Sequence, residues 1–376
     1  MSQPSSQRPE SDKQIADPKA LLKTVVNRPI RVAVFGFGGL GKGMARLIPH
    51  RPDFKLVAIA DSSGYCVDPK GLNVQTVDAL AQAAQYPEVG KASENAMLEL
   101  LQGHAENIDA VFMALPNLPV DFFAKTVKAI AENTGFKGVF VDALKRTEAV
   151  ERLFALNDTL RHDKILYITG AGATPGFLTT VAAVAAQSFV EVLKVDIRFG
   201  VGVANWENYK ATVREDFIHL EGFDAKRVAC MSDEEIAAEL EARNGLIALE
   251  NMEHADDIIL ELAGVCPRDR VSVGGLVDTR NAKKPISTQV SVTGRTMNGA
   301  VGTHQFIVSD EASMVDNVCG PALGFLLRGV EQWEQGHYGI VTSADLMPRF
   351  ASQVQMASKA DIPAERQISE KTLVTA

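Results

Sequence analysis

Three glycines near the N-terminus constrain the fold of this chain more than any other feature. Gly36, Gly38 and Gly41 have the spacing G-x-G-x-x-G, directly after the apolar run RVAVF and at the start of the run GLGKGMARLI. A strand that leads through such a turn straight into a helix is typical of the first unit of a doubly wound parallel sheet. We therefore predict a sheet of this kind in the N-terminal half.

The same turn predicts a dinucleotide site. The first glycine permits a tight turn, the second lets the backbone approach a pyrophosphate, and the third lets the helix pack close to the strand. The helix N-terminus adds N–H donors and a partial positive charge. The residues predicted to contact this part of the cofactor are Gly36, Phe37, Gly38, Gly39, Leu40 and Gly41.

The next apolar run, KLVAIADSSG, ends at Asp61, twenty residues after Gly41. A carboxylate at this distance binds the ribose hydroxyls of the adenosine and repels a 2'-phosphate, which favours NAD(H). Ser62 and Ser63 favour NADP, because hydroxyls can bind a phosphate. The alternative to a nucleotide site is a glycine-rich turn followed by a helix-capping aspartate.

Short apolar runs alternate with longer polar or amphipathic stretches from residue 28 to about residue 177. Apolar runs without alternation belong to parallel strands covered on both faces, so this segment is predicted to be a Rossmann dinucleotide-binding domain. The predicted strands are RVAVFG, KLVAIAD, DAVFMALP, GVFVDA and KILYITG. The strand DAVFMALP ends beside the switch point of the sheet, where the nicotinamide side of a dinucleotide lies. Its predicted cofactor contacts are Ala114, Leu115, Pro116 and Asn117, although a Pro-terminated strand followed by a turn would explain Asn117 equally well.

The second half of the chain has a different pattern. We predict that residues 178–319 form an α+β domain for substrate binding and oligomerisation, with a mostly antiparallel sheet. Its predicted strands include EVLKVDIRFGVG, ISTQVSVTGRT and THQFIVSD. Thr174 and Pro175 predict a helix start, and Ser232 with Glu235 forms a capping box. The amphipathic segment 320–345 can return to complete the first domain. Residues 1–27 predict a disordered tail and residues 355–376 a polar tail.

Composition excludes several classes of protein. With 47 acidic and 38 basic residues the net charge is -9, so the chain has no excess of positive charge for nucleic acid. Its four cysteines lie far apart and predict neither a disulfide framework nor a zinc site. The polar N-terminal stretch lacks the apolar run of a signal peptide, and the longest mostly apolar stretch, around Leu178 to Ala186, is too short to span a bilayer. We expect a soluble cytoplasmic homo-oligomer, such as a homodimer, that acts on a small molecule.

Two later segments bring out a family resemblance. GVFVDALKR places Lys145 just after a strand, and KILYITGAGATPGF runs from a strand into a Gly-rich turn that contains Gly172, Thr174 and Pro175. With ADSSG, this order resembles homoserine dehydrogenase over about residues 31–177. WENYK and GPALGFLLRG in the second half look more like the saccharopine dehydrogenase-like oxidoreductases, which oxidise or reduce C–N bonds of amino acids.

The resemblance implies roles for particular residues. Lys145 would lie beside the nicotinamide and polarise or protonate the reacting carbonyl or imine, because a fixed cation stabilises the charge that hydride transfer builds on the heteroatom. Gly172 would contact the nicotinamide and Thr174 the substrate. The alternatives are a solvated lysine next to Arg146 and a plain loop between domains. Asp142 would either orient Lys145 or cap a helix.

The second half offers weaker candidates. Glu207, Tyr209 and Lys210, near Arg214, form a polar cluster suited to an amino acid's carboxylate and amine, or an ordinary polar surface. His304 alternates with apolar neighbours and is a candidate to face the cleft, with a structural role as the alternative. His254, in EHADD, invites a metal site, but this spacing without a second His or Cys cluster is a poor one, and no metal is predicted.

These observations predict an NAD(P)-dependent dehydrogenase or reductase. Hydride would move to or from the C=N or C=O carbon of an amino-acid-derived metabolite held between the two domains. One alternative is homoserine dehydrogenase, which would need an acidic pair and a second lysine that no motif in the second half places. Another is a nucleotide-binding redox sensor without catalysis.

Overall fold

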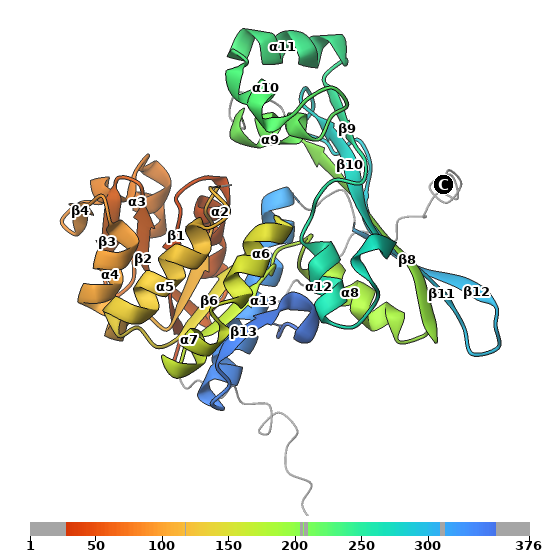
Figure 1. The fold of residues 1–376 in the computed structure, drawn as a ribbon. Coiled ribbons are helices and arrows are strands. Elements are labelled where there is room, and N and C mark those ends of the chain that lie inside the picture. The colour runs from red at the N-terminus through yellow and green to blue at the C-terminus, as the bar shows by residue number, and fades with distance from the viewer. Residues whose placement is uncertain (1–27, 117, 204–205, 207–209, 309–312, 351–376) are drawn as a thin grey trace, which may run out of the picture.

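The computed structural model describes residues 28–350, except for residues 117, 204–205, 207–209 and 309–312. The described chain forms two sheets, each with its own helices (Figure 1). The predicted tails, together with Asn117, Glu207 and Tyr209, lie outside the described residues. None of the helices in the described ranges has the length and apolar character needed to cross a membrane.

The first sheet has eight strands in the described chain, in the order β13-β7-β6-β5-β1-β2-β3-β4. Six neighbouring strands from β13 to β2 are parallel, and β3 and β4 extend the edge in antiparallel pairing. Chain order reverses between β1 and β5, which creates the crevice where such sheets bind ligands. The strands are β1 (Ile30–Phe35), β2 (Phe54–Asp61), β3 (Gly64–Val67), β4 (Gly90–Ala92), β5 (Ala110–Met113), β6 (Val139–Asp142), β7 (Leu166–Thr169) and β13 (Gly339–Thr342).

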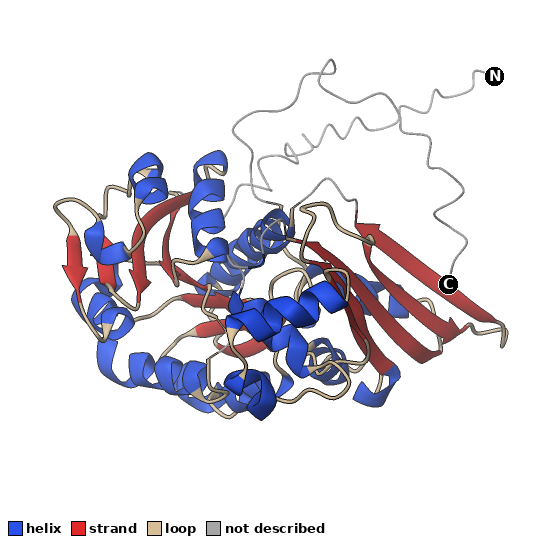
Figure 2. Ribbon diagram, turned by 90° about the horizontal axis from the view of Figure 1, so that it is seen from above, coloured by secondary structure: helices blue, strands red, loops and turns tan. Residues whose placement is uncertain are grey.

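Helices cover both faces of this sheet, as the apolar strands require. Along β1, Val32 and Val34 pack into the core under α2, α3 and α13, while Ala33 and Phe35 pack into the core under α4, α5, α6 and α7. Figure 2 shows helices around and between the two groups of strands. The helices are α2 (Gly39–Leu47), α3 (Val74–Ala79), α4 (Ala96–His104), α5 (Phe122–Thr134), α6 (Thr147–Phe154), α7 (Asn157–His162) and α13 (Met314–Glu334). The predicted α/β fold with a doubly wound parallel sheet is confirmed.

The second sheet has five strands in the described chain, in the order β12-β11-β8-β10-β9. Only β8 and β10 pair in parallel, so the predicted, mostly antiparallel α+β unit is also confirmed. The short β9 and the glycine-containing β10 carry a weak strand pattern and were not predicted. The strands are β8 (Glu191–Gly202), β9 (Leu246–Leu249), β10 (Val271–Asp278), β11 (Thr288–Arg295) and β12 (Val301–Val308). The helices are α8 (Phe177–Ala186), α9 (Lys210–Ile218), α10 (Ala225–Cys230), α11 (Asp233–Ala242) and α12 (Asp256–Leu262).

The C-terminal segment returns to the first sheet. Helix α13 contributes Cys319, Leu323 and Leu326 to the core beneath β1, and β13 pairs in parallel with β7. A Cβ on Gly43 of α2 would lie 2.1 Å from Val315 of α13, so the two helices are in close contact. We propose that α13 and β13 belong to the dinucleotide-binding domain and that the rest of the predicted domain division holds.

The structure corrects one helix boundary and confirms another. Helix α8 begins at Phe177 after Gly176, and not at Thr174 as predicted. The Thr174 hydroxyl donates to Asp256 instead, and Pro175 lies in a turn closed by the Gly172 N–H. The capping box at the start of α11 is confirmed, because the Ser232 hydroxyl and the Glu235 carboxylate each accept from the other's backbone N–H.

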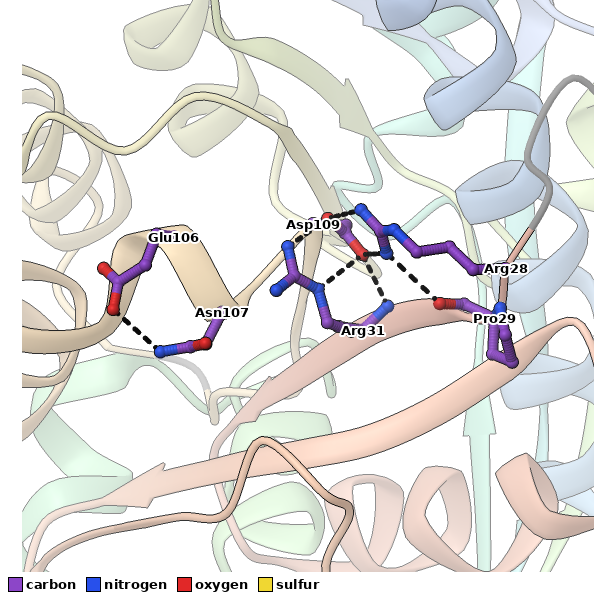
Figure 3. Close-up of polar contacts among 6 residues, drawn as sticks. All are labelled: Arg28, Pro29, Arg31, Glu106, Asn107 and Asp109. Carbon is purple, nitrogen blue, oxygen red and sulfur yellow. Dashed lines mark hydrogen bonds and ion pairs between the residues drawn. The ribbon is translucent and has the colours of Figure 1, made fainter.

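An arginine pair ties the N-terminal ends of β1 and β5 together (Figure 3). Asp109, just before β5, accepts hydrogen bonds from the guanidinium groups of Arg28 and Arg31 and from the Arg31 backbone N–H. Burial alone would raise the pKa of Asp109, but these hydrogen bonds outweigh it and lower the pKa to about 2, from an ordinary value of 3.8. The ionised form of Asp109 is therefore more stable in the folded protein than in the unfolded chain.

We predict that Asp109→Asn destabilises the fold at neutral pH by about 2 kcal/mol, the free energy that corresponds to this pKa difference. A carboxylate with a lowered pKa stabilises the fold above its unfolded pKa and loses this effect as the pH falls through the folded pKa. The gap between wild type and variant should therefore shrink as the pH drops from about 5 to about 2. Urea unfolding at several pH values measures it, with the exposed Glu106→Gln as control. A gap that stays constant with pH would contradict the assignment.

Candidate functional site

A cavity of about 1360 Å³ lies between the carboxyl ends of the parallel strands and the second sheet. The first sheet contributes the loops after β1, β2, β5, β6 and β7, and the second contributes β8, β10, β11 and α9. We call this space the cleft. The predicted site residues that line it are Gly36, Phe37, Gly38, Gly39, Leu40, Asp61, Ser62, Ala114, Leu115, Pro116, Lys145, Gly172 and Thr174.

The three glycines of the first turn have different constraints. Gly36 has a φ of 99°, and a Cβ there would lie 2.3 Å from the Ala114 carbonyl oxygen. A Cβ on Gly41 would lie 2.0 Å from the Gly36 carbonyl oxygen, so this glycine lets α2 pack on the turn. Around Gly38 no described atom lies within 4 Å of the Cβ position, which leaves the N-terminus of α2 open to the cleft. The turn thus has room for a pyrophosphate where the helix dipole favours one.

Asp61 ends β2 and has its carboxylate fixed by its neighbours. One oxygen accepts from the backbone and hydroxyl of Ser63, at 2.8 and 2.6 Å, and the other accepts from the Ala83 N–H at 2.9 Å. Each carboxylate oxygen has two acceptor positions, so the second oxygen keeps one position for a ribose hydroxyl. The cleft residues near Asp61 are Ser62, Ala81 and Gln82, none of which is a cation.

Lys145 lies in the loop after β6 and faces the second sheet across the cleft. Its side chain is 28% exposed, and Nζ is 3.1 Å from Oε2 of Glu215 on α9. Asp142, fully buried at the end of β6, accepts from the backbone N–H of Leu144 and of Gly170, and from two hydroxyls on β7. Asp142 therefore caps no helix and holds in place the loop that carries Lys145.

The crossing turn after β7 is fixed by a second buried carboxylate. Asp256, at the start of α12, accepts from the hydroxyls of Thr174, at 2.6 Å, and Thr179. His254 Nδ1 lies 2.8 Å from Asp256 Oδ2, an ion-pair distance without good hydrogen-bond alignment. The His254 ring is 4% exposed and lines the cleft. The EHADD segment thus supplies a buried histidine–aspartate pair, and among the described residues no group of three His, Cys, Asp or Glu side chains could hold a metal ion.

Sequence reasoning missed an acidic pair on α9. Glu215 and Asp216 both line the cleft, and Asp216 is 5% exposed. Burial raises the pKa of Asp216 to about 7; Lys145 opposes this rise and Glu215 adds to it. Burial also lowers the pKa of His219, one turn further along. In the sequence VREDFIHL these acids look like part of an ordinary solvated helix, and only the fold turns them toward the cleft.

Some predicted residues do not line the cleft. His304 is exposed on the edge strand β12, and its ring lies tilted against the Phe189 ring with 5.1 Å between their centroids. Lys210, at the start of α9, pairs with Asp233 at the start of α11 at 2.5 Å. Gly41 is among the predicted residues that do not line the cleft, and it lets α2 pack on the glycine turn. Ser63 does not line the cleft either, and its hydroxyl donates to Asp61.

Comparison with known proteins begins with the fold. The chain aligns with a mutant meso-DAP dehydrogenase from Clostridium tetani E88 with DAP, with a TM-score of 0.51 and 14% identity over 85% of this chain and 94% of the other. It aligns with the DAP dehydrogenase of C. glutamicum in complex with DAP, with a TM-score of 0.50 and 16% identity over 84% and 93%. The family model of Glutamate/Leucine/Phenylalanine/Valine dehydrogenase matches residues 19–123. The structural likeness shows a shared fold, and the family model covers the segment that holds the glycine turn and Asp61.

Sequence relatives define the family. The chain is 38% identical over 352 residues to (S)-8-amino-7-oxononanoate synthase BioU of Haloferax mediterranei, which covers 85% of this chain and 99% of the relative. It belongs to the family of that synthase. A homoserine dehydrogenase of Methanocaldococcus jannaschii is 33% identical over 72 residues, only 16% of this chain and 21% of that protein. The predicted homoserine dehydrogenase resemblance thus has a local counterpart, and the saccharopine dehydrogenase-like resemblance stays a prediction.

We predict that Gly38→Asp folds normally and loses measurable dinucleotide binding. The open space at its Cβ position accommodates the side chain. The added carboxylate then repels a pyrophosphate at the N-terminus of α2. Titration of NADH fluorescence measures binding, and a thermal melt checks the fold. Gly103→Asp, the same change at an open glycine outside the cleft, is the control. Unchanged affinity in a folded Gly38→Asp variant would remove this turn from the cofactor site.

Proposed function

We propose that this chain transfers hydride between NAD(H) and the C=N or C=O carbon of an amino-acid-derived metabolite, a saccharopine dehydrogenase-like chemistry. The observation that carries the proposal is the position of Lys145, which lines the cleft 3.1 Å from Glu215. A cation held there stabilises negative charge on a reacting oxygen or nitrogen. Bound NAD(H), held by the glycine turn and Asp61, would supply or accept the hydride.

The family supports a substrate class. The relative is a synthase of (S)-8-amino-7-oxononanoate, a compound with an amine beside a ketone and a carboxylate at the far end of an apolar chain. We propose that this chain forms or consumes an amino ketone of this kind. In the forming direction, a vicinal diamine, NAD⁺ and water give the amino ketone, ammonium, NADH and a proton. In the reverse direction the ketone carbon is reduced and gains the nitrogen.

We propose a separate role in this reaction for each of three side chains, those of Lys145, His254 and Asp256. The Lys145 ammonium would polarise the carbonyl or imine during hydride transfer. His254 lines the cleft, and an imidazole there is a candidate to exchange a proton with the substrate heteroatom. Asp256 would orient the ring, as a carboxylate beside the other nitrogen does in acid–base pairs. The contacts of Thr174 with Asp256 link this pair to the crossing turn.

Homoserine dehydrogenase is the second candidate. The 72-residue likeness supports it, and so does the acidic pair on α9, the feature that the sequence alone did not place. Purified protein assayed with homoserine and with vicinal diamines or amino ketones, each with NAD(H) and NADP(H), separates the two. Cofactor binding without turnover of any of these substrates would favour the redox sensor. A homo-oligomer in the cytoplasm stays a prediction.

For the cofactor we predict tighter binding of NADH than of NADPH, because Asp61 repels a 2'-phosphate and no cation lies beside it among the described cleft residues. Asp61→Ala and Asp61→Asn both remove the charge and should narrow or reverse the preference, by about tenfold or more in the ratio of Kd values. Fluorescence titration with each cofactor measures the ratio. The exposed Asp78→Ala is the control. A wild type that prefers NADPH would show that Ser62 and Ser63 decide the choice.

For Lys145 we predict that Lys145→Met lowers turnover by about two to three orders of magnitude, the loss typical of one preorganised donor. NADH affinity should change little, because the glycine turn and Asp61 lie on other strands. Steady-state kinetics with the best amino ketone or diamine measures the effect. Lys137→Met, at an exposed lysine just before β6, is the control. A Lys145 variant as fast as the wild type would exclude this lysine from the chemistry.

A further inference from the structure

Helix α9 brings two carboxyl groups to a part of the cleft that holds one ammonium group. Glu215 and Asp216 are consecutive residues, and both line the cleft on the wall opposite Lys145. The Lys145 Nζ is 3.1 Å from Glu215, so the first carboxylate already has a cationic neighbour. The second carboxyl group, on Asp216, is 95% buried, and no described residue forms a hydrogen bond or ion pair with its side chain.

A buried carboxylate without a partner is unfavourable, and such groups bind a cation or keep a proton. The charged neighbours of Asp216 are Lys145 after β6 and Glu215 beside it on α9. His219, just beyond α9, has the same two neighbours and also Glu253 and His254 before α12. Among these described neighbours, Lys145 is the one side chain with a permanent positive charge. The two acids on α9 thus share one ammonium group, that of Lys145.

We propose that Asp216, together with Glu215, binds the ammonium group of the substrate, and that this binding displaces a proton from Asp216. The cleft that holds the acids is the one that holds the glycine turn, so the bound amine would lie within the same cavity as the cofactor. The inference rests on the proposed function for the identity of the amine-bearing substrate, and it names the group that recognises it.

The electrostatics of the cluster support the proton release. Because burial raises the pKa of Asp216 to about 7, its carboxyl group is divided between the protonated and ionised forms near neutral pH. An aliphatic ammonium keeps its proton in this range and prefers the ionised carboxylate. Affinity for an amine should therefore rise with pH, by about tenfold between pH 6 and pH 8, and level off above.

The test uses the protein with NADH bound and 8-aminononanoate as the probe. A saturated amine cannot react with NADH, so binding is measured without turnover. Titration calorimetry at pH 7 in three buffers of different ionisation enthalpy gives the number of protons released. We expect about half a proton from the wild type and none from Asp216→Asn, whose Kd for the probe rises about tenfold or more. Nonanoate, which lacks the amine, should bind both proteins alike.

The control variant is Glu221→Gln, which removes an exposed acid just beyond α9 and should behave as wild type. Proton release that persists in Asp216→Asn, or equal affinity of variant and wild type, would overturn the proposal. So would a wild type that does not bind 8-aminononanoate. If Asp216→Asn does not fold, the pH dependence of the wild-type Kd decides, and a flat profile between pH 6 and pH 8 overturns the proposal.

The outcome is separable from the proposed function. Proton-linked binding of 8-aminononanoate that depends on Asp216, without turnover of any amino ketone or diamine, would keep the ammonium subsite and reject the proposed reaction. Turnover of an amino ketone with unchanged kinetics in Asp216→Asn would keep the reaction and reject the subsite.

Discussion

The reactive end of the cleft depends on one buried carboxylate, Asp142. At the end of β6 it accepts from the backbone of Leu144 and Gly170 and from side chains of β7. It therefore joins two neighbouring loops, one that carries Lys145 and one that crosses to the second sheet. A carboxylate in this position is costly to bury, and its four donors, two backbone N–H groups and two hydroxyls, make the cost tolerable. Loss of any donor would loosen both loops together.

The two ends of the cleft use opposite electrostatics. At the cofactor end the N-terminus of α2 is open beside Gly38 and favours a pyrophosphate. At the other end the acids of α9 outnumber Lys145, which favours a cationic group. The proposed anionic cofactor and the proposed amine-bearing substrate would each fit one end of the cleft and be repelled by the opposite end. This separation would orient the two reactants without any specific contact between them.

The sequence predicted more of the residues that line the cleft near the glycine turn than of those near the second sheet, for a physical reason. A glycine turn after a strand, and an acid at the end of the next strand, are local patterns whose spacing follows from the geometry of the parallel sheet. The pattern that identifies Gly36 and Asp61 can therefore be recognised within about thirty residues of sequence. Lys145 was found by resemblance, and the sheet places it on the same edge as the glycine turn.

The substrate half depends on long-range packing that no local pattern records. Asp216 reaches the cleft because α9 packs under the second sheet, and its neighbours in sequence resemble those of any amphipathic helix. His254 was noticed and weighed only as a metal ligand, since its pairing with Asp256 requires the start of α12 to meet the crossing turn. Conversely, the strand pattern around His304 is compatible with a position facing the cleft, but His304 lies on the edge strand β12 and does not line the cleft.

The ion pair between Lys145 and Glu215 makes the two halves of the molecule depend on each other. One residue belongs to the first sheet and the other to the second, so their contact spans the cleft. A partly buried pair is costly to break because each charge is left without its partner. A substrate ammonium between the walls would add a second cation beside Lys145, opposite the two acids Glu215 and Asp216. Filling the proposed subsite would therefore add a second electrostatic contact between the walls, and substrate binding itself would strengthen the link between the two halves.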